Sequence, residues 1–121
     1  MIKNLILVLI ARVLFLLLEP ISFVYVVVIK EKISINRING YLYSSAYNTD
    51  RFGNHEFRSL FNRILIIEGG HQFGDFGESV SSVLGRNKLT NTLSKTGIML
   101  DQILDFFDKD HSIKAIPKEQ I

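Results

Sequence analysis

An apolar stretch near the amino terminus, from Leu5 to Ile29, constrains this chain more than any other feature. Of its 25 residues, 21 are apolar. The four interruptions are Arg12, Glu19, Pro20 and Ser22. Roughly 20 apolar residues carry an α-helix across the hydrocarbon core of a bilayer. We therefore predict a single membrane-spanning helix, with the lipid bilayer as the partner of this segment.

Two other interpretations of the stretch are open. A secretory signal peptide has a short apolar core followed by small residues at a cleavage site, whereas Val28, Ile29 and Lys30 end this one, so we expect it to be retained. Alternatively, the β-branched run from Phe23 to Ile29 follows a proline and could form a buried strand of a soluble core.

The net positive charge of the chain lies beside the apolar stretch. Residues 1–32 carry four basic and two acidic side chains, and the other 89 residues carry ten of each. The polar part therefore has no basic excess, which argues against nucleic acid as a partner. Lys30, Lys32 and Arg37 follow the span and Lys3 precedes it. The positive-inside rule then places the polar part in the cytoplasm of the host, or inside the particle if the membrane is viral.

Arg12 and Glu19 are charges within the predicted span. Seven residues separate them, so they share a helix face about 10 Å apart along the axis, too far for a tight pair. Each charge costs about 3 kcal/mol at the bilayer centre. Self-association, with Arg12 meeting Glu19 of an antiparallel copy, or pairing with another membrane protein would offset this cost. Alternatively, Arg12 snorkels to the interface and Glu19 and Pro20 mark a kink or re-entrant bend.

The sequence of the polar part predicts an all-α domain. We predict a membrane anchor over 1–32, a domain of about four helices over 33–116 and a tail over 117–121. Apolar spacing predicts helices from Ser34 to Asn48 and from His55 to Ile66, separated by a break over 48–54.

Further along, the run 69–77 has four glycines in nine residues and is the predicted functional loop. Asp75 and Glu78 have the spacing of a capping box, which predicts a short helix ended by Gly85. A final helix from Thr90 to Asp110 is expected to bury one stripe, namely Leu93, Thr96, Leu100, Ile103 and Phe107, with Leu89 and Leu104 widening it.

The sequence favours neither a metal nor a cofactor. It has no cysteine, which excludes disulfides, zinc fingers and a thiol nucleophile. Asp101, Asp105 and Asp108 share one edge of the final helix with His111 and could suit a hard divalent cation. A solvated acidic face is the favoured interpretation, and no metal-binding or nucleotide-binding motif is present.

Several residues could carry hydrolytic chemistry if the helices bring them together. Glu78 or Asp108 could act as acid or base with His111 as partner, and Ser79 with His71, His111 and Asp108 offers the parts of a Ser/His/Asp site. The alternative is structural, with Glu78 and Ser79 starting a helix and His71 lying in a loop or core.

Short elements in fixed order give the chain a family resemblance. They are Asp50 to Asn54, Gly69 to Gly74, Glu78 to Asn87, Thr92 to Ser94 and Asp108 to His111. The chain resembles small bacteriophage and prophage proteins that carry Asp-Gln-x-x-Asn, Gly-Gly-x-Phe-Gly, Asp-Glu-Thr-x-Ser and late Asp-x-x-His-Cys elements, often behind an apolar amino terminus. The resemblance implies a phage origin and a membrane anchor, and names no reaction.

The resemblance also singles out a shared polar cluster. Its members would be Asp50, Asn54, Glu78, Ser79, Ser82, Asp108 and His111, beside His71 of the glycine loop. The chain departs from the group at Arg51, where the group has Gln, at Gly77 and Ser79, where it has Asp and Thr, and at Ser112, where it has Cys.

Three functions follow from these features. The first is a membrane-anchored phage protein that acts by association, in a virion membrane or the host envelope. The second is a membrane-tethered hydrolase in lysis or envelope remodelling. The third is a holin-like pore, for which one span with a large polar domain is an awkward architecture.

Overall fold

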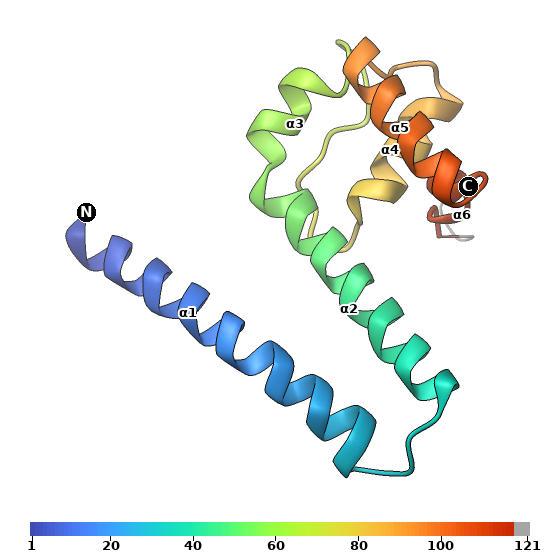
Figure 1. Cartoon of the computed structure of the whole chain (residues 1–121). Coiled ribbons are helices and arrows are strands. Elements are labelled where there is room, and N and C mark those ends of the chain that lie inside the picture. Colours follow the sequence, from blue (N-terminus) through green and yellow to red (C-terminus); the bar gives the residue numbers. More distant parts are fainter. Residues whose placement is uncertain (118–121) are drawn as a thin grey trace. The chain divides into compact units, whose positions relative to one another are not determined.

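The computed structural model describes residues 1–117, and the regular elements in this range are helices (Figure 1). The predicted all-α class is confirmed: within residues 1–117 the only β pairing is an isolated antiparallel bridge between Ile66 and Leu93. The chain divides into two compact units, one spanning Met1–Ser45 and the other beginning at Ala46. The boundary falls inside one helix, so each unit is described by itself.

The first unit begins with the predicted apolar helix. Helix α1 spans Ile2–Val24 and continues as one π-helical turn, η1, over Tyr25–Ile29. The alternative of a buried strand over Phe23 to Ile29 is therefore wrong. Pro20 lies inside α1 without ending it. No residue of α1 is buried, so an apolar helix long enough to cross a bilayer presents its side chains outward. This is consistent with a single-pass anchor or a signal sequence.

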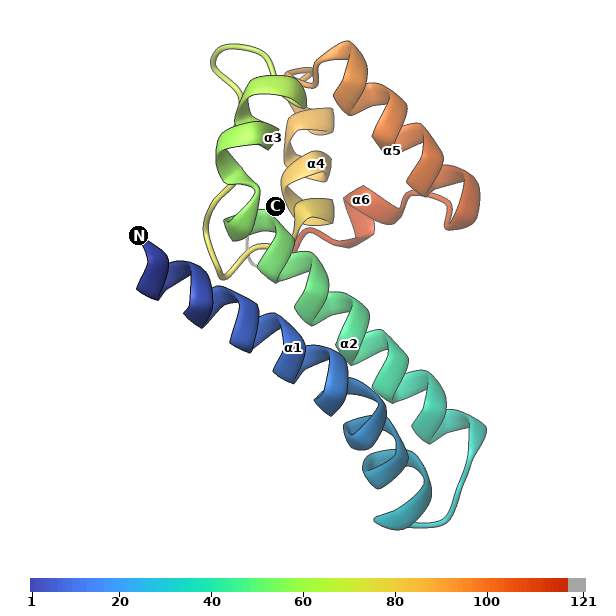
Figure 2. The same ribbon diagram turned by 60° about the vertical axis from the view of Figure 1, so that its left-hand side comes forward.

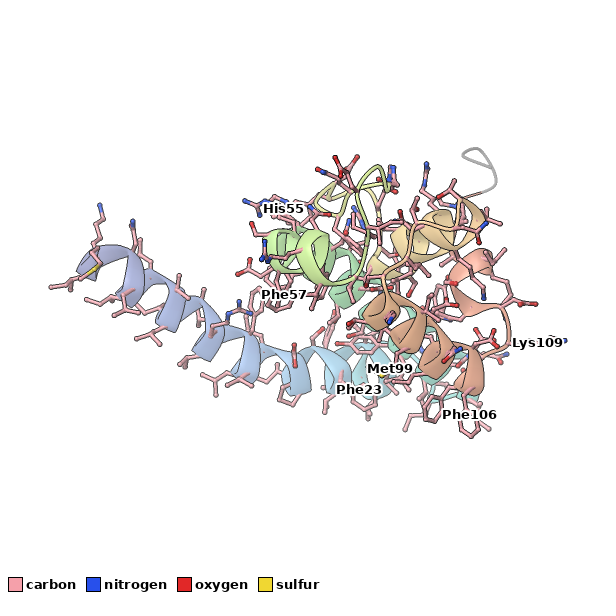
Figure 3. The ribbon with its side chains drawn as sticks, turned by 90° about the horizontal axis from the view of Figure 1, so that it is seen from above. Phe23, His55, Phe57, Met99, Phe106 and Lys109 are labelled. Atoms are coloured by element: carbon pink, nitrogen blue, oxygen red, sulfur yellow. The ribbon has the colours of Figure 1, made fainter. Side chains whose placement is uncertain are left out.

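The end of this apolar segment packs within the first unit. Val27 is buried, and the ring of Phe23 (labelled in Figure 3) meets that of Tyr41 edge-on at 5.4 Å. Arg37 donates to the carbonyl oxygen of Val26 and pairs with Glu31 at 2.7 Å. These contacts join the end of the apolar segment to the start of the next helix.

Helix α2 spans Ile35–Glu56 and corrects the predicted break over 48–54. Asn and Asp residues favour turns because their side chains can bond to nearby backbone. Here Asp50 and Asn54 instead direct their side chains to residues that follow Gly74 in the chain, so the helix continues. The predicted helix from His55 to Ile66 is correspondingly shorter: after a kink at Phe57, α3 spans Arg58–Ile64.

The core of the second unit lies between α3, α4 and α5. Its buried members are Leu65, Ile66, Phe73, Val83 and Leu84. Helix α4 spans Val80–Leu89, with Ser79 as its N-cap in place of the predicted capping box. Gly85 was predicted to end this helix, but it lies inside α4. A Cβ at Gly85 would lie 2.2 Å from the carbonyl oxygen of Ser112, so glycine is required where α4 meets α6 (Figure 2).

The predicted final helix, from Thr90 to Asp110, is shorter in the structure, and a further short helix that was not predicted follows it. Helix α5 spans Lys95–Phe107 with Ser94 as N-cap, and α6 spans His111–Lys114 after a turn in which Asp110 has a positive φ of 58°. The buried face of α5 is also rotated from the predicted stripe, because Gly97 and Asp101 are buried while Phe107 is 82% exposed. Its neighbour Phe106, 84% exposed, extends from the end of α5 in Figure 3.

Candidate functional site

Three asparagine side chains hold the glycine-rich loop, and we call them the amide clamp: Asn54, Asn62 and Asn87. Asn62 accepts from the amide of Phe73 at 2.7 Å and donates to its carbonyl at 3.1 Å. Asn87 makes the same pair of bonds with His71, both at 2.8 Å. A side-chain amide can donate and accept at once, so it replaces the strand or helix partner that a loop residue lacks.

Asn54 completes the clamp from inside α2. Its Nδ2 donates to the carbonyl oxygens of Asp75 and Glu78 at 2.8 and 2.9 Å, and its Oδ1 accepts from the amide of Gly74. Gly74 has a φ of +137°, a conformation that favours glycine. Asn54 and Asn87 are completely buried, so the predicted functional loop has a fixed backbone.

The first polar group beside the loop is the Glu78 cluster, formed by Glu78, His71 and Arg86. The Nε2 atom of His71 lies 3.0 Å from both carboxylate oxygens of Glu78, and Nε of Arg86 lies 3.2 Å from one of them. Glu78 is buried, so the Arg86 guanidinium and the contact with the His71 ring offset its desolvation. A pocket of about 450 Å³ adjoins His71 and Arg86; its other lining residues are Gly69, Gly70, Leu89, Thr90 and Ile116.

The second polar group is the Ser81 cluster, formed by Ser81, His111 and Asp108. Oγ of Ser81 lies 3.1 Å from Nε2 of His111, and Nδ1 of His111 lies 2.9 Å from Oδ2 of Asp108. The other Asp108 oxygen accepts from Nζ of Lys114 at 2.5 Å. Hydrogen bonds from Lys114 and His111 hold the pKa of Asp108 below its usual value, so its carboxylate is ionised at neutral pH.

Asp50 joins the Ser81 cluster from α2. Its Oδ2 accepts from the backbone amide of Ser81 at 3.3 Å, at the first turn of α4. The remaining members of the predicted cluster, Ser79 and Ser82, bond to each other: Oγ of Ser79 accepts from the Ser82 amide, and Oγ of Ser82 donates to the Ser79 carbonyl. Both are helix-start residues.

The three aspartates of α5 and its end do not share one solvated edge. Asp101 is buried, where Ser112 donates to it and Lys88 pairs with it at 2.9 Å. The bond to Asp101 raises the pKa of the Lys88 ammonium. Asp105 instead accepts from the backbone amide of Asp110. Over residues 1–117, no group of three or more acidic or histidine side chains could hold a metal ion.

The predicted site residues therefore fall into separate groups. Glu78 joins His71, whereas Asp108 joins His111 and, through Ser81, Asp50. Arg12 and Glu19 lie on α1 with exposed side chains. Sequence reasoning did not select Ser81, Arg86 or Asn87. The serines of 79–82 look alike in sequence, and only the approach of α6 distinguishes Ser81 from its neighbours.

Comparisons with known proteins add no relative from which a role could be transferred. No protein-family model, no curated protein and no solved structure matches this chain. The resemblance to phage proteins therefore stays a prediction.

Proposed function

We propose that the protein is anchored in a membrane by residues 2–29 and acts there by association with a second copy of itself. The observation that carries this proposal is the complete absence of burial along α1. Exposing an apolar helix of this length to water is unfavourable, whereas hydrocarbon is the solvent in which such a helix is stable.

Glu19 supports the association. It follows 14 mainly apolar residues, counted from Leu5, and its side chain is exposed on α1. A carboxylate within the hydrocarbon costs about 3 kcal/mol, and a polar or basic group on a second helix lowers that cost. The exposed apolar side chains of α5, among them Met99 and Phe106, support association in the same sense.

Two measurements test the proposal. The full chain, expressed in cells, should stay with the membrane fraction through an alkaline carbonate wash. Cross-linking in mild detergent should then give a dimer or higher species, which Glu19→Gln should reduce several-fold. Glu68→Gln, the same change in an exposed loop residue, is the matched control. Release of the chain by carbonate would contradict the anchor, and a monomer in all three proteins would contradict the association.

The hydrolase alternative has one specific observation in its favour, the Ser81 cluster, in which a serine hydroxyl meets a histidine that is bonded to a carboxylate. Nothing in residues 1–117 favours the holin-like pore, and the virion location rests on the resemblance alone.

A further inference from the structure

We propose that Ser81, His111 and Asp108 form a nucleophilic site that hydrolyses small carboxylic esters. The serine hydroxyl, the imidazole ring and the carboxylate follow one another in the order that acyl transfer requires. Ser81 Oγ meets Nε2 of His111 at 3.1 Å, and Nδ1 of the same ring meets Asp108 Oδ2 at 2.9 Å. Each ring nitrogen thus faces the partner that it has in the Ser/His/Asp arrangements of unrelated hydrolase folds.

The hydrogen bonds of the cluster define the proton positions. An ionised carboxylate can only accept, so in the neutral ring Nδ1 carries the proton that bonds to Asp108. Nε2 is then left with a lone pair and accepts from the hydroxyl of Ser81. Lys114 holds the other oxygen of Asp108 and so fixes the carboxylate that orients the ring.

The backbone around Ser81 supplies a place for negative charge. Ser81 lies in the first turn of α4, and its amide already donates to a carboxylate oxygen, Oδ2 of Asp50, at 3.3 Å. In acyl transfer the amide of the nucleophile is one donor to the oxyanion. The carbonyl oxygen of an ester can accept from this amide only if Asp50 Oδ2 moves away from it, so binding of the ester must displace the Asp50 side chain.

The reaction balances without a further reactant except water. Oγ of Ser81 bonds to the ester carbonyl carbon while its proton passes to Nε2 of His111. The bond from that carbon to the alkoxy oxygen then breaks, and the alcohol leaves with the His111 proton. Water attacks the acyl carbon and gives a proton to Nε2; the bond between that carbon and Oγ then breaks, Oγ takes the proton from Nε2, and the carboxylic acid leaves.

Burial limits the size of the substrate. The side chains of His111 and Asp108 are 37% and 52% exposed, whereas Ser81 as a whole is only 5% exposed. The pocket beside His71 and Arg86 does not include Ser81 among its lining residues. An ester must therefore approach from the His111 side with a short acyl group, which makes acetyl esters the class to test.

The test uses the full chain purified in mild detergent. A fluorophosphonate probe, followed by peptide mass spectrometry, should label Ser81, and the protein should hydrolyse p-nitrophenyl acetate above the rate in buffer. Ser81→Ala should abolish labelling and lower hydrolysis about 100-fold or more, and His111→Ala should do the same. Asp108→Asn should lower hydrolysis about 10-fold or more.

The matched control is Ser82→Ala, which removes the next hydroxyl in the same helical turn and should keep both labelling and hydrolysis. Circular dichroism of each variant establishes that it is folded. Covalent labelling at Ser81 is a readout that a purely structural hydroxyl would not give. Absence of label on Ser81 in the folded wild-type protein overturns the proposal, as does hydrolysis that Ser81→Ala leaves unchanged.

Discussion

Glu78 and Ser81 lie three residues apart in the chain, yet the two clusters named after them differ in the burial of their carboxylates and in the partners of those carboxylates. Glu78 is buried, and two basic side chains contact its carboxylate. Asp108, the carboxylate of the Ser81 cluster, is half exposed and contacts a histidine and a surface lysine. The first arrangement holds a buried charge in place, whereas the second sets the buried hydroxyl of Ser81 in series with an imidazole and a carboxylate that are partly exposed.

This difference in burial indicates which polar groups stabilise the fold. A buried charge that loses its partner is strongly destabilising, while an exposed ion pair contributes little. We therefore expect substitutions in the Glu78 cluster to change stability first and substitutions in the Ser81 cluster to change reactivity first.

The largest effect on stability is expected from Gly85→Ala. The new Cβ would lie 2.2 Å from the carbonyl oxygen of Ser112, so backbone must move and α6 must separate from α4. We expect a loss of about 3 kcal/mol in the free energy of unfolding, measured by denaturant titration in detergent. Because α6 carries His111, fluorophosphonate labelling of Ser81 should be lost as well.

Gly40→Ala is the matched control for this prediction. No atom lies within 4 Å of a Cβ at Gly40, in the exposed part of α2. Alanine there should raise the stability by about 0.5 to 1 kcal/mol, because glycine is a poor helix former. Equal effects at the two positions would show that the contact between α4 and α6 is not as close as described.

The second prediction concerns Glu78→Gln. The variant keeps the shape of the side chain but removes the charge that faces His71 and Arg86, and we expect it to lose about 2 kcal/mol of stability. Adding Arg86→Gln should restore part of the loss, since both charges are then absent. The double variant would contradict the pairing if the two losses simply added in denaturant titrations.

The fold was predictable where one physical signal dominated. The long apolar run from Leu5 predicted α1, because hydrophobicity over more than 20 residues outweighs single interruptions such as Pro20. Helix ends were less predictable. Asn54 and Gly85 look like a helix breaker and a helix cap in sequence, but each is explained by a segment distant in the chain, the glycine loop for Asn54 and α6 for Gly85.

The candidate site was predictable only where a local feature of the sequence marked it. The glycine-rich composition of 69–77 indicated a special loop, and Asp108 and His111 were selected as possible partners from their spacing. No local signal distinguishes Ser81 from Ser79 or Ser82, because the choice depends on how α6 meets the first turn of α4. The acidic spacing of α5 was also misleading, since Asp101 points inward to Lys88 and Ser112.

The smallest effect is expected from Asp108→Asn, and it depends on pH. The pKa of Asp108 is lowered in the folded protein by Lys114 and His111. The ionised carboxylate therefore stabilises the fold above its ordinary pKa near 3.8, and this contribution is lost as the pH falls through the lower pKa of the folded state. The melting temperature of the wild type should exceed that of the variant slightly at pH 7, and the difference should shrink as the pH falls below 3.8.

Asp110→Asn is the control for this last prediction, because Asn tolerates the positive φ at that position and the change removes a neighbouring carboxylate. If both variants had the same pH dependence, the effect would belong to net charge and not to the bonds of Asp108. If Asp108→Asn changes the melting temperature little but lowers ester hydrolysis strongly, the contrast between the Glu78 cluster and the Ser81 cluster is sharpened. The Ser81 cluster would then be maintained by its chemistry, since stability alone would not require it.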